Sequence, residues 1–173
     1  MGALVDVQQK WRWIFFMAMI ELERRTRPYF DIVAGANRIH TMLDTGADFS
    51  VYTKDIETLK TIFPNLITTD AVAYISGFGG NVGKSRVYVI PELVLGDIRY
   101  VHIPIVCIPN DKLSAELVLA SNILSSSPFT IDYSKRILNI TKVRDTVWCN
   151  YICEFRDTVK ENVWVKTSVL IQE

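Results

Sequence analysis

The pattern of hydrophobic and polar positions changes character near Pro28. Before it, the apolar residues 13–20 fit a buried helix or a strand equally well, because a short apolar run has no decisive period. After it, short apolar runs separated by turn residues are typical of a sandwich or barrel. Spaced apolar residues predict one short helix within 53–66. Strands are predicted at 29–33, 38–43, 71–75, 86–90, 93–95, 100–108, 116–119, 130–133 and 137–140.

The last part of the chain has a simpler pattern. Residues 147–155 and 163–171 are both strand-like, and the charged segment 156–162 separates them. Two strands joined by a short polar connection predict a terminal β-hairpin.

Composition and charge narrow the functional classes. The chain has 173 residues, of which 49% are hydrophobic and 22% are charged, as in ordinary globular domains. Because 19 Lys and Arg balance 19 Asp and Glu, we expect no nucleic-acid partner. The run 13–20 is shorter than the roughly 20 apolar residues that a membrane span needs. We therefore expect a cytoplasmic protein without a transmembrane segment, with an interfacial anchor as the alternative.

Cysteine and histidine offer little chemistry at the level of sequence. The three cysteines, Cys107, Cys149 and Cys153, form no CxxC pair, which argues against a disulfide scaffold. The two histidines, His40 and His102, are isolated in apolar or strand-like runs and lack the ligand spacing of zinc sites. We therefore expect no metal.

The segment around Asp44 is the strongest candidate for chemistry. Met42 and Leu43 bring this carboxylate to the end of a predicted buried strand, and Thr45 adds a hydroxyl beside it. Gly46 allows a tight turn and the close approach of a second chain. Asp, Thr and Gly are also ordinary turn residues, so a plain hairpin corner is the alternative.

Three further segments of the sequence are informative together with this one. They are Arg27-Pro28, the glycine-rich stretch 75–80 (Ile-Ser-Gly-Phe-Gly-Gly) and the stretch 117–124 (Leu-Val-Leu-Ala-Ser-Asn-Ile-Leu). Together with 43–48, they make residues 27–133 resemble the retropepsins, the single-domain aspartic proteases of retroviral type. The chain departs from that pattern in having Ala120 where Gly is usual and Ser121 where viral members often have Arg. The 40 residues after Tyr133 have no viral counterpart and favour a cellular or mobile-element relative.

The resemblance implies a mainly all-β fold, the closed β-barrel of the acid proteases, with a short helix. It also implies a division of the chain. Residues 1–26 are expected to be an N-terminal extension containing the apolar segment and a candidate dimer interface. Residues 27–141 would be the aspartic protease domain, and 142–173 the C-terminal hairpin extension.

The resemblance also implies a function, an aspartic endopeptidase without a cofactor that cleaves peptides or proteins bound in extended conformation. Because the chain has one Asp-Thr-Gly, a homodimer would supply both carboxylates, and the catalytic residues would be Asp44, Thr45 and Gly46. Arg27 would pair across the dimer with Asp48. The substrate-binding residues would be Ala47, Asp48, Val118 and the flap residues Gly77, Phe78, Gly79 and Gly80.

Other functions fit the same residues. A catalytically weak retropepsin-like module could serve for dimerisation and peptide binding. A structural subunit could recruit a partner through its terminal hairpin and its N-terminal apolar segment. For the glycine-rich stretch the alternative is a plain surface turn. The presence of Asp-Thr-Gly-Ala together with the flap glycines favours the enzyme, because docking alone requires neither.

Overall fold

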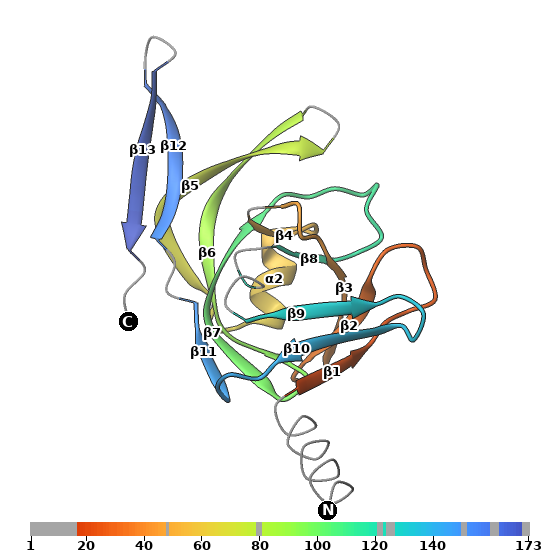
Figure 1. The fold of residues 1–173 in the computed structure, drawn as a ribbon. Coiled ribbons are helices and arrows are strands. Elements are labelled where there is room, and N and C mark those ends of the chain that lie inside the picture. The colour runs from red at the N-terminus through yellow and green to blue at the C-terminus, as the bar shows by residue number, and fades with distance from the viewer. Residues whose placement is uncertain are drawn as a thin grey trace, which may run out of the picture.

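The computed structural model describes residues 17–47, 49–78, 81–120, 123, 127–149, 152–159 and 163–170. For residues 17, 74–78, 81–83, 152–159 and 163–170 it describes the course of the backbone. Within these ranges the chain is built almost entirely of β-strands, with one short α-helix, α2 (Ile56–Ile62). The expectation of a mainly all-β fold is therefore confirmed (Figure 1).

The largest sheet is mixed and contains most of the strand residues. Its strands run in the spatial order β2-β3-β8-β4-β7-β6-β5, and β11 pairs with β7 in parallel. β8 lies between β3, to which it is parallel, and β4, to which it is antiparallel. The strands are β2 (Tyr29–Ala34), β3 (Asn37–Leu43), β4 (Ser50–Tyr52), β5 (Ile67–Phe78), β6 (Asn81–Leu95), β7 (Ile98–Cys107), β8 (Leu117–Leu119) and β11 (Thr146–Trp148).

A second sheet of three strands brings the N-terminal strand β1 together with the later strands β9 and β10. β1 (Met17–Glu21) pairs with β10 (Ile137–Thr141), which forms the predicted hairpin with β9 (Phe129–Asp132). The described end of the apolar N-terminal run is thus a strand. Ala18 and Leu22 are buried in the main core, so β1 is part of that core. Residues 13–16 lie outside the described part of the chain.

The strands differ from the sequence prediction mainly in length. β6 continues through Pro91, where the pattern predicts two separate strands. Proline has no N–H to donate, so it is found in strands at edges and irregularities. Pro91 faces His102 between the pairs Ile90↔Ile103 and Glu92↔Val101, and His102 has φ 58°, which is unusual for a strand residue. The ladder therefore accommodates the proline at a local irregularity.

The helix α2 forms where the spaced apolar residues predict it. The Asp55 side chain caps its first turn by accepting hydrogen bonds from the Thr58 N–H, at 2.8 Å, and from the Thr58 hydroxyl. These bonds favour the ionised form and lower the pKa of Asp55. Leu59 and Phe63 then face the core.

The core is divided between two clusters. The larger one gathers buried residues of β1, β2, β3, β4, β6, β7, β8, β10 and α2, including Phe30, Tyr52 and Tyr100. The smaller one includes Met42 of β3, Val51 of β4, Ala73 of β5 and Val118 of β8. Side chains of a strand alternate between the two faces of a sheet, so neighbouring positions such as Val51 and Tyr52 belong to different clusters.

The predicted terminal hairpin is present. β12 (Ile152–Val159) and β13 (Val163–Leu170) pair antiparallel from Ile152↔Leu170 to Val159↔Val163. Residues 156–159, predicted as part of the charged connection, belong to β12 because the backbone pairing continues through them. In Figure 1 the hairpin stands beside β5. The boundaries at residues 27 and 142 stay predictions.

Within the described residues, no helix has both the length and the apolar character needed to cross a membrane.

The docking of β1 against the β6–β7 turn can be tested at Gly96. A Cβ built at Gly96 (φ +62°) would lie 2.9 Å from the Ala18 Cβ, whereas Gly35 (φ +60°) has nothing within 4 Å. Gly35→Ala should cost only the backbone strain, roughly 1–2 kcal/mol. Gly96→Ala should cost roughly 1–3 kcal/mol more, because the methyl overpacks β1. Urea unfolding of both variants measures the difference, and equal losses would contradict this docking.

Candidate functional site

Two neighbouring segments fix the position of Asp44 at the end of β3. The Asp44 N–H donates to the Leu119 carbonyl at 2.8 Å, so the β3–β8 pairing continues into the loop. One residue earlier, the Leu43 N–H donates to the Pro28 carbonyl at 3.0 Å. The backbone at Asp44 is therefore held between the end of β8 and the segment that precedes β2.

The loop after β3 folds back onto the Asp44 side chain. The Gly46 N–H donates to Asp44 Oδ1 at 3.0 Å, and the Ala47 N–H donates to the Asp44 carbonyl at 3.4 Å. These bonds orient a half-buried carboxylate, while Thr45 and Gly46 beside it are exposed. The structure thus brings Asp44, Thr45, Gly46 and Ala47 together in one turn.

Gly46 is not required by the conformation of this chain. It does not have a positive φ, and a Cβ built on it would lie 3.5 Å from Asp44 Oδ1, an ordinary contact. The tight turn after Asp44 therefore forms without a backbone conformation that favours glycine. The other expected role of Gly46, the close approach of a second chain, remains a prediction.

The far side of the loop is fixed through Ser50, which the sequence analysis did not single out. The Ala120 N–H donates to Ser50 Oγ at 3.0 Å, and both residues are completely buried. This bond joins the start of β4 to the end of β8. No local sequence signal points to Ser50, because its partner is 70 positions away. Ala120, which replaces the usual glycine, has a fully buried methyl group that the packing accommodates.

Val118 lies inside the protein. Its side chain is completely buried in the smaller core cluster, and its Cα partners are Met42 on β3 and Val51 on β4. A side chain in this position supports the strands that carry the loop. We therefore leave Val118 out of the substrate-contacting residues proposed below.

The glycine-rich stretch lies at the far end of the β5–β6 hairpin. β6 pairs with β7 only from Val87 onward, so the distal part of the hairpin, from Val72 to Arg86, is a two-stranded arm. The arm projects beyond the body of the sheet (Figure 1). Its backbone pairing reaches Phe78↔Asn81, so Gly77 and Phe78 end β5, while Gly79 and Gly80 lie outside the described residues.

Arg27 is exposed and lies just before the segment that holds Leu43. Its main chain is therefore close to the loop that carries Asp44. Its expected partner Asp48 and the variable position Ser121 lie outside the described residues, so the pairing stays a prediction.

The two free cysteines in the described part of the chain, Cys107 and Cys149, do not offer a nucleophile. The Cys107 thiol donates to the Lys54 carbonyl at 2.9 Å, and burial, with a smaller effect of Asp55, raises the pKa of Cys107 to about 11. Burial raises the pKa of Cys149 to about 12. Because the thiolate is the reactive form, neither residue is suited to nucleophilic catalysis near neutral pH.

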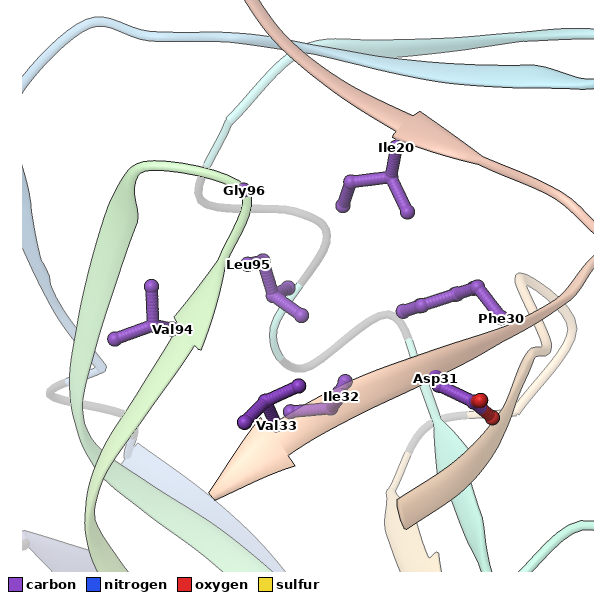
Figure 2. Close-up of a pocket in the computed structure, with 8 residues that line it drawn as sticks. All are labelled: Ile20, Phe30, Asp31, Ile32, Val33, Val94, Leu95 and Gly96. Atoms are coloured by element: carbon purple, nitrogen blue, oxygen red, sulfur yellow. The ribbon is translucent and has the colours of Figure 1, made fainter. Parts of the chain in front are cut away.

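A pocket of about 200 Å³ lies between β1, β2 and the end of β6 (Figure 2). It is smaller than typical ligand pockets, and none of its residues belongs to the Asp44 loop or to the arm. It is therefore not part of the candidate active site. Its lining consists of Ile20, Phe30, Asp31, Ile32, Val33, Val94, Leu95 and Gly96.

The Ser50 contact gives a test of how the loop is supported. Ser50→Ala leaves the buried Ala120 N–H without its partner and should lower the free energy of unfolding by about 1–3 kcal/mol. The matched control is Ser134→Ala, which removes an exposed hydrogen bond to Asp132 and should change stability by less than about 0.5 kcal/mol. Chemical denaturation compares the two, and an equal effect would show that Ser50 does not support the loop.

Comparison with known proteins agrees with this geometry. No protein-family profile and no curated protein sequence matches the chain. Among solved structures, it is similar to a retropepsin-like aspartic protease from Rickettsia conorii, with 25% sequence identity and a TM-score of 0.50. The match covers 72% of this chain and 89% of the Rickettsia chain. The resemblance drawn from the sequence motifs is therefore confirmed, and the chain has the fold of the retropepsin-like aspartic proteases.

Proposed function

We propose that this protein is an aspartic endopeptidase that acts as a homodimer, each protomer contributing Asp44 to a shared pair of carboxylates. The observation that carries the proposal is the placement of Asp44, held at the end of β3 by the Leu119 carbonyl and oriented by the Gly46 N–H. The sequence has a single Asp-Thr-Gly, so a second copy of the chain supplies the second carboxylate.

The chemistry follows from the pair. Two carboxylates about 3 Å apart cannot both be ionised, so they share one proton. The ionised Asp44 takes a proton from water, whose oxygen attacks the scissile carbonyl carbon, and the protonated Asp44 donates its proton to the carbonyl oxygen. Collapse of the tetrahedral intermediate breaks the C–N bond, and proton transfer to the amine releases the two peptides. The exposed Thr45 and Gly46 complete the catalytic loop.

The two-stranded arm is proposed as the flap that covers the substrate. An extended peptide could pair its backbone with the arm and with Ala47 and Asp48 of the loop, as in strand addition. Gly77, Phe78, Gly79 and Gly80 at the tip would close over it and exclude water. An arm paired to the rest of the sheet only at its base can bend more readily than a strand with neighbours on both sides, which supports this role.

The alternative is a retropepsin-like module that binds peptides with little catalysis. It draws on Ala120, because an added methyl group in a tightly packed position can displace the loop. The burial of Ala120 and its hydrogen bond to Ser50 show that the fold accommodates the methyl group, which favours the enzyme. A cytoplasmic location and the absence of a nucleic-acid partner stay predictions from composition.

Asp44→Asn tests the mechanism. The amide oxygen can still accept from the Gly46 N–H, so the loop should stay folded, but an amide cannot share or transfer the proton. We expect hydrolysis of a mixture of denatured proteins, followed by mass spectrometry of the products, to fall by at least about 10³-fold. The control is Asp111→Asn, a change of the same type at an exposed loop position, which should keep wild-type activity. Full activity of Asp44→Asn would contradict the aspartic mechanism.

Arg27 and Asp48 test the dimer. A guanidinium binds a carboxylate through a planar set of donors, so we expect Arg27 to pair with the partner's Asp48. Arg27→Ala should weaken dimerisation more than it weakens folding of the protomer. The free energy lost would be about 3–5 kcal/mol if the pair is buried in the dimer and about 0–1 kcal/mol if it stays exposed.

The measurement is the dimer dissociation constant, by analytical ultracentrifugation, of Arg27→Ala, Asp48→Ala and the double variant. Coupled effects support the pair, whereas effects that simply add show that the side chains do not interact. The same dilution series with an activity assay tests the shared site, because a monomer has only half of the dyad. Constant specific activity in the monomeric range would contradict it.

A further inference from the structure

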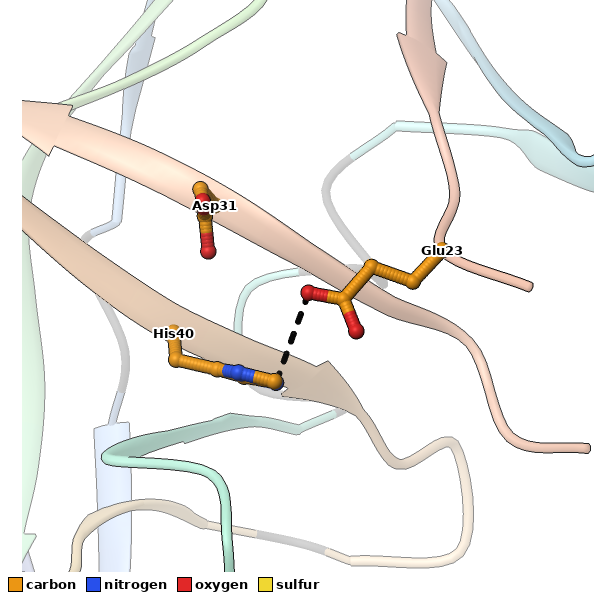
Figure 3. A group of neighbouring side chains, drawn as sticks. All are labelled: Glu23, Asp31 and His40. Carbon is orange, nitrogen blue, oxygen red and sulfur yellow. Dashed lines mark ion pairs between the residues drawn. The ribbon is translucent and has the colours of Figure 1, made fainter. Parts of the chain in front are cut away.

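Three side chains from consecutive segments of the chain meet outside the candidate active site. Glu23, Asp31 and His40 each offer one metal-ligating atom, and these three atoms lie within 4.8 Å of one another (Figure 3). Glu23 follows β1, Asp31 lies on β2 and His40 lies on β3. The group therefore connects three segments, the last of which leads to Asp44.

Strand pairing and one backbone hydrogen bond bring these three side chains together. Asp31 and His40 are directly opposite each other in the β2–β3 ladder, so their side chains leave the sheet on the same face. Their neighbours Phe30 and Ile39 point the other way, into the main core. Glu23 joins them because its N–H donates to the Tyr29 carbonyl at 2.8 Å.

The His40 ring nitrogen is the unexplained feature of this group. Nε2 is buried and makes no hydrogen bond within the described part of the chain, and Glu23 Oε1 lies 3.6 Å from it. The ring is fixed edge-on against Tyr29, with 5.1 Å between the ring centroids. A buried polar atom without a partner is unfavourable, so a ligand that satisfies it would stabilise the arrangement.

We propose that Glu23, Asp31 and His40 bind a divalent transition-metal ion, with zinc as the natural choice. Imidazole and carboxylate oxygens are common zinc ligands, and three protein ligands leave a further position for water. Two zinc bonds of roughly 2.0–2.1 Å at a tetrahedral angle place their donor atoms roughly 3.3–3.4 Å apart. The 3.6 Å between Nε2 and Oε1 needs only a small adjustment to reach this value, and all three ligand atoms, which lie within 4.8 Å of one another, would move closer together around one ion.

The groups that compete for the carboxylates are exposed arginines. Arg25 lies 3.3 Å from Glu23, and Arg38 lies 3.3 Å from Asp31, with side chains that are 51% and 75% exposed. Exposed ion pairs of this kind contribute little to stability, so a metal can replace them at low cost. The rival occupant is a proton on His40, which would turn the same group into a set of ion pairs.

Bound metal would link the segment after β1 to the β2–β3 hairpin. β3 continues directly into the loop that holds Asp44, so this link would stiffen the strand that positions the proposed catalytic carboxylate. The expectation of no metal rests on the ligand spacings of zinc motifs, whereas the pairing of β2 with β3 brings these ligands together at a spacing that no such motif has. The proposal does not depend on the proposed protease activity.

The experiment is a titration of the chelator-treated, full-length protein with cobalt(II), which reports nitrogen and oxygen ligation through its visible absorption, followed by competition with zinc. We expect one ion per chain, displaced by zinc. His40→Asn should weaken binding at least about tenfold. The matched control is His102→Asn at the second histidine, which stacks against Trp148 away from the group and should bind as the wild type does.

Thermal unfolding provides the second readout. Zinc should raise the unfolding temperature of the wild type and of His102→Asn, but not that of His40→Asn. If His40→Asn does not fold, Glu23→Gln, which changes a partly exposed side chain, is used in its place. Absence of binding to the wild type, or unchanged binding in the Glu23 and His40 variants, would overturn the proposal. If acid stabilises the protein only when His40 is present, and no metal binds, then the group forms ion pairs with a protonated His40 instead.

Discussion

The arrangement of the whole site depends on the insertion of β8 between β3 and β4. β3 ends at Leu43, the chain makes the loop that carries Asp44, and β4 returns, yet these two strands do not pair with each other. β8 fills the gap and pairs with both. The Asp44 N–H bonds to Leu119 on one side, and the Ala120 N–H bonds to Ser50 on the other. A loop anchored at both ends by a third, buried strand can hold a carboxylate in one orientation without forming a hairpin.

This anchoring holds the base of the loop and leaves its outer side open. The buried residues Val118, Ser50 and Ala120 fix the strands below the loop, while Thr45 and Gly46 above it are exposed. Neither the φ angle nor the surroundings of Gly46 require a glycine. A residue that could carry a side chain in this chain, yet carries none, is the expected result if another chain must pack closely on the loop. The geometry thus agrees with a site shared between two protomers.

The sequence predicts the parts of this fold that depend on local patterns. Alternating apolar residues identify β2, β3, β7 and the β9–β10 hairpin, and spaced apolar residues identify α2, because neighbours along the chain decide these elements. The three-residue strands β4 and β11 are too short to show a period. β1 is ambiguous until its partner β10 is known.

The same distinction separates the two functional groups. Asp44, Thr45 and Gly46 are consecutive, so their motif is legible in the sequence. Ser50 acquires its role from Ala120, and His40 acquires its neighbours from Asp31 across a ladder and from Glu23 beyond β1. Interactions between different strands leave no fixed spacing in the sequence. Sequence motifs therefore reveal the candidate reacting group, whereas the residues that support it become visible only in the folded chain.

The N-terminal strand shows how far the supports extend beyond the recognisable motifs. The resemblance begins at Arg27, yet Ala18 and Leu22 before it fill the main core, and the Ala18 Cβ closes against Gly96 at the β6–β7 turn. At the same end of the sheet, where Met17 pairs with Thr141, Lys142 lies 2.7 Å from Asp97 of that turn and 3.0 Å from Asp145. Residues from both sides of the predicted protease domain thus meet at one turn. A fragment reduced to residues 27–141 would lose these contacts and expose the edge of β10 that pairs with β1, so the Asp44 motif and its neighbours do not define the folding unit.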